Sequence, residues 1–108
     1  MFVVVFRSVL RQDADRSAHD RLDDELRELA KSERGFLGVE TLTSRDDAGS
    51  VTISQFEDLA AVEEWGRNAH HVLAQLRGRS EFYASYSVQT CQVIRESRFD
   101  AGGVEHSR

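Results

Sequence analysis

Two adjacent histidines, His70 and His71, are the side chains of this chain best suited to proton transfer. A histidine changes charge near neutral pH, so either one could act as a general base or, as a neutral imidazole, bind a metal. If residues 59–76 form one unbroken helix, a rotation of about 100° per residue places His71 opposite the apolar stripe that contains Trp65. His71 would then face solvent beside Arg67. The spacing alone therefore favours a surface position for His71.

Three aromatic side chains follow the histidines and could line a pocket for a flat molecule: Phe82, Tyr83 and Tyr86. Neighbouring residues of a strand point to opposite faces, so only some of the three can share one pocket. A tyrosine hydroxyl inside a cavity needs a hydrogen-bond partner. Candidates for that partner are Asn68, His71 and Arg79.

Two further candidates, Trp65 and Arg79, also have a structural interpretation. Trp65 lies on the apolar stripe, where packing in the core is more consistent with its position than stacking on a substrate. Arg79 follows Gly78 and could either cap the last carbonyls of the helix or anchor a substrate.

The other reactive side chains are better explained by structural roles than by catalysis. Cys91 is the single cysteine and lies within an expected strand, where no helix dipole activates a thiol and no second thiol completes a disulfide or zinc site. Arg7 stands on an otherwise apolar strand and needs a partner, for which Glu40 is a candidate. His19 and His106 are expected to face solvent. No Ser-His-Asp order, phosphate-binding loop or dinucleotide-binding fingerprint is present.

Hydrophobic periodicity predicts the strands that position these side chains. Residues 2–10 carry apolar side chains on both alternating faces, which is typical of a strand covered on both sides. Further strands are expected at 36–45, 50–57 and 85–97. The first two of these should form an antiparallel hairpin around the turn at 46–49.

Helical spacing of apolar residues predicts two helices, at 16–32 and 59–76. The first should carry an i,i+4 ion pair between Asp23 and Arg27, and Asp58 is the expected N-cap of the second. The resulting β-α-β-β-α-β order is typical of the ferredoxin-like class of α+β folds, with a four-stranded antiparallel sheet and two helices on one face.

Two helices can cover only one face of such a sheet. The other face would carry either the Val or the Phe residues of the first strand into water, together with part of the last strand, and monomers usually tolerate no apolar patch of that size. A second copy packed sheet to sheet would cover it, so we expect a two-fold homodimer.

Length and charge exclude several classes of function. A chain of 108 residues forms one small domain, and its net charge of −5 argues against a non-specific nucleic-acid binder. The longest apolar run, Met1–Phe6, is far shorter than the ~20 residues of a membrane span, and no cleavable signal follows it. We expect a cytoplasmic protein with neither a nucleic acid nor a membrane as partner.

Residues 63–96 combine a Trp early in the second helix, an Asn-Ala-x-His run, a Gly-Arg pair, an aromatic-Tyr pair, a further Tyr and a final Val-x-Arg-Glu. These residues are Trp65, Asn68, Ala69, His71, Gly78, Arg79, Phe82, Tyr83, Tyr86, Val93, Arg95 and Glu96. With GFLGVE at 35–40 and the apolar first strand, this pattern resembles the antibiotic biosynthesis monooxygenase family, whose members are dimeric α+β barrels. The resemblance covers nearly residues 1–99, which we expect to form the domain, with a flexible C-terminal tail at 100–108.

The resemblance implies a break in the second helix near Gly66–Asn68, which would turn His71 toward a pocket between the helices and the sheet. The implied catalytic residues are His71, Asn68 and Tyr83. The implied substrate-binding residues are Trp65, Arg79, Phe82 and Tyr86. The implied activity is a cofactor-independent monooxygenation of a small aromatic molecule, such as a phenol, a quinol or a polyketide, with no cofactor and no metal.

Two alternatives stay open. The chain could be a non-catalytic dimeric protein that binds a small aromatic molecule or heme. It could also be a heme-degrading monooxygenase with an atypical site. The heme-degrading branch of the family has an axial His nine or ten residues after the helix Trp, where this chain has Ala74 and Gln75, and an Asn on the first strand, where it has Phe6 and Arg7.

Overall fold

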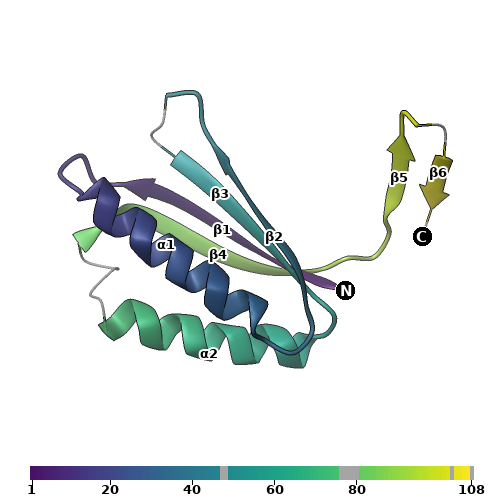
Figure 1. Cartoon of the computed structure of the whole chain (residues 1–108), viewed down its shortest axis with the longest axis horizontal. Helices are drawn as coiled ribbons and strands as arrows, with labels where there is room; N and C mark the ends of the chain where they lie inside the picture. The colour runs from purple at the N-terminus through teal and green to yellow at the C-terminus, as the bar shows by residue number, and fades with distance from the viewer. Residues whose placement is uncertain (47–48, 76–80, 103, 108) are drawn as a thin grey trace.

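The computed structural model describes the backbone of residues 1–46, 49–75, 81–102 and 104–107, and the side chains of the same ranges except 71–75 and 104–107. The elements are β1 (Phe2–Leu10), α1 (Arg16–Lys31), β2 (Phe36–Thr43), β3 (Gly49–Phe56), α2 (Leu59–Gln75), β4 (Tyr83–Gln92), β5 (Ser97–Asp100) and β6 (Val104–Ser107). The first four strands form one antiparallel sheet in the order β2-β3-β1-β4, and both helices lie on the same side of it (Figure 1). The predicted ferredoxin-like βαββαβ fold is confirmed.

The alternation predicted for the first strand divides the sheet into two different faces. Val4 packs against α2, and Phe2 lies beside it, so even-numbered residues of β1 point toward the helices. We call this side the helix face. The odd-numbered residues Val3, Val5, Arg7 and Val9 point the other way, toward what we call the open face.

The core lies between α2 and the central strands. Phe56 is completely buried, and Val4, Ala61 and Val62 pack with it. The ring of Trp65 stacks on Phe56 with 6.5 Å between centroids, so Trp65 packs on this core from α2. Burial of these side chains holds α2 at a fixed position over the sheet.

Helix α2 runs unbroken from Leu59 to Gln75. The break near Gly66–Asn68 that the family resemblance implies is therefore wrong. A glycine inside a helix costs about 1 kcal/mol relative to alanine, a cost that the packing of Val62 and Trp65 on the core offsets.

Each helix begins at a capping aspartate, which is Asp15 for α1 and the predicted Asp58 for α2. The Asp15 side chain accepts a hydrogen bond from the Ala18 amide at 3.0 Å, and the Asp58 side chain accepts one from the Ala61 amide at 2.8 Å. Asp58 also pairs with Arg34 at 3.2 Å. The hydrogen bond from Arg34, followed by that from the Ala61 amide, lowers the pKa of the Asp58 carboxyl. The charged form thus caps α2.

Gly35 sits where the loop after α1 passes close to α2. Its φ is +82°, and a Cβ built on it would lie 3.0 Å from the Cβ of Ala61. We expect Gly35→Ala to destabilise the protein by about 2 kcal/mol, because alanine in this region is strained and the contact is too short. Thermal unfolding by circular dichroism should show Tm lower by roughly 10 °C.

Gly66 provides the matched control for this prediction. It lies inside α2, and a Cβ built there would meet no atom within 4 Å. Gly66→Ala should therefore raise Tm, since alanine is the better helix former. Equal Tm changes in the two variants would contradict the role assigned to Gly35.

The open face carries one charged side chain among its valines on β1. The Arg7 guanidinium donates to the Gln89 side-chain oxygen at 2.5 Å. The prediction that Glu40 is the partner of Arg7 is wrong. Gln89 lies on β4, which pairs directly with β1, whereas Glu40 lies on β2, which β3 separates from β1. The neutral side chain of Gln89, on the neighbouring strand, thus provides a hydrogen-bond acceptor for Arg7.

A hairpin of β5 and β6 follows the main sheet, and it was not expected from the sequence. It stands away from the helices and the four-stranded sheet (Figure 1). Ile94 before it is 95% exposed and Phe99 within it is 79% exposed. The radius of gyration, 15.3 Å, exceeds the ~13 Å typical of a compact chain of this length, as a projecting segment would cause.

Candidate functional site

A cleft of about 560 Å³ lies between the two helices and the helix face of the sheet. Its wall is largely apolar and aromatic and includes Val4, Phe6, Val62, Trp65, Tyr83 and Tyr86. These side chains come from β1, β4 and α2, so the fold itself assembles the cleft. A largely apolar cavity with a few polar groups is the usual form of a small-molecule site.

Tyr83 and Tyr86 share this cleft because β4 contains a β-bulge. In its pairing with β1, Ser85 lies opposite Val9 and Tyr83 lies opposite Leu10, so the register skips Ala84. The skipped residue brings Tyr83 onto the same face as Tyr86, with 5.7 Å between the ring centroids. Regular alternation would have separated the two rings, and bulges of this kind are common beside active sites.

Phe6 completes this aromatic cluster from the neighbouring strand. Its ring lies 5.7 Å from that of Tyr83 and 5.5 Å from that of Tyr86. Burial, with smaller contributions from Asp23 and Tyr86, raises the pKa of the Tyr83 hydroxyl to about 12. Tyr83 therefore stays neutral at physiological pH and keeps a proton to donate.

His19 lies directly behind Tyr83, and the expectation that it faces solvent is wrong. Its side chain is only 15% exposed, and its ring packs against Phe82 at 5.8 Å and Tyr83 at 5.6 Å. Nε2 of His19 is 3.3 Å from the Tyr83 hydroxyl. The sequence carried a signal for this position, because His19 precedes Leu22 by three residues and Leu26 by seven, on one stripe of α1.

Arg27 brings a positive charge to the cleft wall. Its Nε donates to Asp23 at 3.4 Å, which confirms the predicted i,i+4 pair, and its Nη2 donates to the Thr41 hydroxyl. Thr41 in turn shares a 3.0 Å hydrogen bond with Thr52. Both members of the ion pair line the cleft, which the spacing did not predict. They offer a donor and an acceptor to the polar edge of a ligand.

The predicted substrate-binding residues divide between the cleft and its surroundings. Trp65 and Tyr86 line the cleft together with Tyr83. Phe82 is buried beside His19 instead, because it precedes the bulge. Arg79 lies outside the described residues, so its role stays a prediction.

Of the two predicted catalytic residues on α2, Asn68 is the one whose side chain the structure describes. The Asn68 amide donates to Glu33, in the loop after α1, and Asn68 is not among the residues of the cleft wall. His70 does line the cleft. The side chain of His71 lies outside those that the structure describes, and its role as a base stays a prediction.

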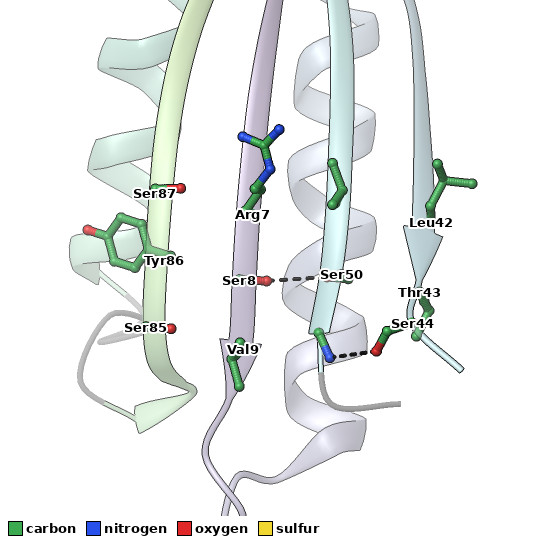
Figure 2. Close-up of a pocket in the computed structure, with 12 residues that line it drawn as sticks. Arg7, Ser8, Val9, Leu42, Thr43, Ser44, Ser50, Ser85, Tyr86 and Ser87 are labelled. Carbon is green, nitrogen blue, oxygen red and sulfur yellow. Dashed lines mark hydrogen bonds between the residues drawn. The ribbon is translucent and has the colours of Figure 1, made fainter. Parts of the chain in front are cut away.

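A second depression, of about 590 Å³, lies on the open face around Arg7. Figure 2 shows Arg7 and Val9 on β1, with Ser85 and Ser87 on β4 and Leu42 on β2. The Ser44 hydroxyl accepts from the Gly49 amide at 3.1 Å here, whereas the hydroxyls of Ser8 and its β3 partner Ser50, which are 3.2 Å apart, belong to positions that point toward the helix face. This depression has few aromatic rings, and a second copy on the open face would cover it. The cleft on the helix face is the better candidate for a functional site.

The parts of the chain that the structure describes hold no helix long and apolar enough to cross a membrane. Over the same ranges, no three His, Cys, Asp or Glu side chains lie close enough together to hold a metal ion.

Comparison with known proteins gives one family and one fold. The model of the family described as antibiotic biosynthesis monooxygenase matches residues 1–77. The uncharacterized protein YqjZ of Bacillus subtilis is 31% identical over 98 residues, which cover 91% of this chain and 83% of that protein.

Solved structures show the same arrangement of helices and strands. Rv0793 from Mycobacterium tuberculosis is 25% identical, with a TM-score of 0.72 over 88% of this chain and 96% of that one. SnoaB from Streptomyces nogalater, described as a cofactor-independent oxygenase, is 14% identical, with a TM-score of 0.72 over 88% and 94% of the two chains. The likeness to SnoaB extends to the fold only.

Proposed function

Because the chain belongs to the antibiotic biosynthesis monooxygenase family, we propose that it is a cofactor-independent monooxygenase of a small aromatic phenol or quinol, bound in the cleft. The observation that carries the proposal is the set of rings from Phe6, Trp65, Tyr83 and Tyr86 around one apolar cavity. Such rings suit a flat aromatic molecule, which can stack on them or meet their edges. SnoaB, of the same fold, supports an oxygenase without a cofactor.

The proposed oxygenation requires few catalytic groups in addition to this cavity. A phenol with a free ring C–H that becomes a quinone takes up one oxygen atom of dioxygen, while the other leaves as water. The substrate supplies all four electrons, so no external reductant is needed. The protein must offer the hydroxyl proton an acceptor and stabilise the resulting anion. Tyr83 and Arg27 line the cleft with a hydroxyl and a guanidinium that can donate hydrogen bonds to that anion.

The proposed active form is a cytoplasmic homodimer. Leu42 is 59% exposed and Val9 is 40% exposed on the open face, where Val3, Val5, Val51 and Ile53 also lie. A second copy would remove this apolar surface from water. A mildly acidic chain with a single cysteine suits the cytoplasm.

Oxygen consumption tests the proposed function directly. Purified protein should accelerate oxygen uptake with 1-naphthol or 1,4-naphthohydroquinone over the rate without protein. With labelled dioxygen, one labelled atom should appear in the product and one in water. Uptake that yields hydrogen peroxide and no labelled product would indicate an oxidase rather than a monooxygenase.

Titration with hemin and with the same phenols separates the enzyme from a ligand-binding protein. A saturable spectral change without oxygen uptake would favour the binding protein. Release of iron and an open-chain tetrapyrrole would instead indicate heme degradation.

A further inference from the structure

The hydrogen bond between Tyr83 and His19 connects the cleft with the outer surface of α1. Tyr83 lines the cleft, and His19 lies behind it with 15% of its side chain exposed. Asp20 follows on the same helix, with 79% of its side chain exposed and its Oδ1 3.6 Å from Nδ1 of His19. The three groups form a path from an apolar cavity to bulk solvent.

The charges around His19 set the direction of this hydrogen bond. The Asp20 carboxylate favours a proton on Nδ1, the nearer ring nitrogen, which leaves Nε2 as an acceptor. Tyr83 is neutral, so its hydroxyl can donate to Nε2 over 3.3 Å. A phenol oxygen that donates its one proton still has two lone pairs. Tyr83 can therefore accept a hydrogen bond from a ligand hydroxyl in the cleft.

We propose that Tyr83 and His19 form a proton relay that removes the hydroxyl proton of the bound substrate. The proton moves from the substrate oxygen to the Tyr83 oxygen while the proton of Tyr83 moves to Nε2 of His19. The substrate becomes an oxyanion, Tyr83 ends neutral, and His19 becomes an imidazolium that releases the Nδ1 proton to solvent beside Asp20. The relay rests on the proposed function. Oxygenation requires the substrate to lose its hydroxyl proton, and the relay is the path by which that proton leaves.

The relay avoids an isolated charge in the apolar cleft. A tyrosinate there would be costly, as the burial of its ring indicates. When both protons move together, the positive charge forms on His19 and the negative charge on the substrate, so that each stabilises the other. The β-bulge at Ala84 makes this possible, since it directs the Tyr83 ring toward both the cleft and His19.

Two substitutions of His19 test proton acceptance against simple positioning. His19→Gln keeps a side chain that can accept from Tyr83 but cannot hold a proton, and His19→Phe removes the acceptor altogether. The relay predicts that both lower kcat for 1-naphthol by ~10²-fold, while KM changes by less than about twofold. Wild-type kcat in His19→Gln would overturn the relay, because His19 would then only orient Tyr83.

A double variant and a rescue sharpen this test. Tyr83→Phe should reduce kcat as much as His19→Gln, and the double variant should lose nothing further, since both residues belong to one path. Imidazole added to His19→Ala should restore part of the activity. Glu25→Gln, on the exposed side of α1, is the control and should keep wild-type kcat. Additive losses at positions 19 and 83 would contradict a single path.

Nitrogen NMR of the His19 ring tests the relay without turnover. The wild-type ring should carry its proton on Nδ1, and the Nε2 resonance should shift in Tyr83→Phe, when the donor is removed. A proton on Nε2 in the wild type would overturn the relay. If no phenol or quinol is turned over but the Nδ1-protonated ring is found, the proposed monooxygenase fails while the Tyr83–His19 path stands.

Discussion

Val5→Asp is expected to convert the proposed dimer, of twice 12.2 kDa, into a monomer at micromolar concentration. Val5 lies at the centre of the open face, opposite Ile53 of β3 on one side and Gln89 of β4 on the other. In a two-fold dimer packed through this face, the two aspartates would be buried near each other without a cationic partner. The cost of such burial is several kcal/mol, which shifts the dissociation constant by three orders of magnitude or more.

Sedimentation equilibrium measures this change directly. Ser17→Asp, on the exposed side of α1, adds the same charge outside the open face and should sediment as the wild type does. A wild-type protein that sediments at 12.2 kDa would refute the dimer. A Val5→Asp variant that stays dimeric would place the interface elsewhere.

The main elements of the fold follow from periodicity because burial acts on every residue of a helix or strand. The apolar residues of the first segment predict a strand, and β1 forms there, between β3 and β4. Asp58 predicts the start of α2 through its capping side chain, which accepts from the Ala61 amide. Local chemistry and tertiary packing agree at these positions.

The site was less predictable because it depends on one irregularity and one contact between distant segments. In a strand with strict alternation, Tyr83 and Tyr86 would point to opposite faces. The bulge at Ala84 places them on one face, and no residue type marks that bulge in the sequence. His19 lies 64 residues before Tyr83 in the chain, so only the folded sheet brings the two together. Its place on the apolar stripe of α1 was the one local sign of burial.

Ala69→Phe is expected to weaken the binding of an aromatic ligand by about 100-fold. Ala69 lines the cleft from α2, on the same helix face as Val62 and Trp65, and its small side chain leaves room beside these residues. A phenylalanine there would occupy space that the ligand needs. The loss of roughly 100 Å² of apolar contact corresponds to ~2.5 kcal/mol, or nearly two orders of magnitude in Kd.

Ala60→Phe provides the matched comparison, because it makes the same substitution on an exposed position of the same helix. Trp65 is the single tryptophan and lines the cleft, so quenching of its fluorescence by 1,4-naphthoquinone reports Kd in all three proteins. The comparison separates a blocked cleft from a general effect on α2, since only Ala69→Phe changes the cleft. If Ala69→Phe folds normally and binds as tightly as the wild type, the ligand must bind elsewhere, and the depression around Arg7 on the open face becomes the site to test.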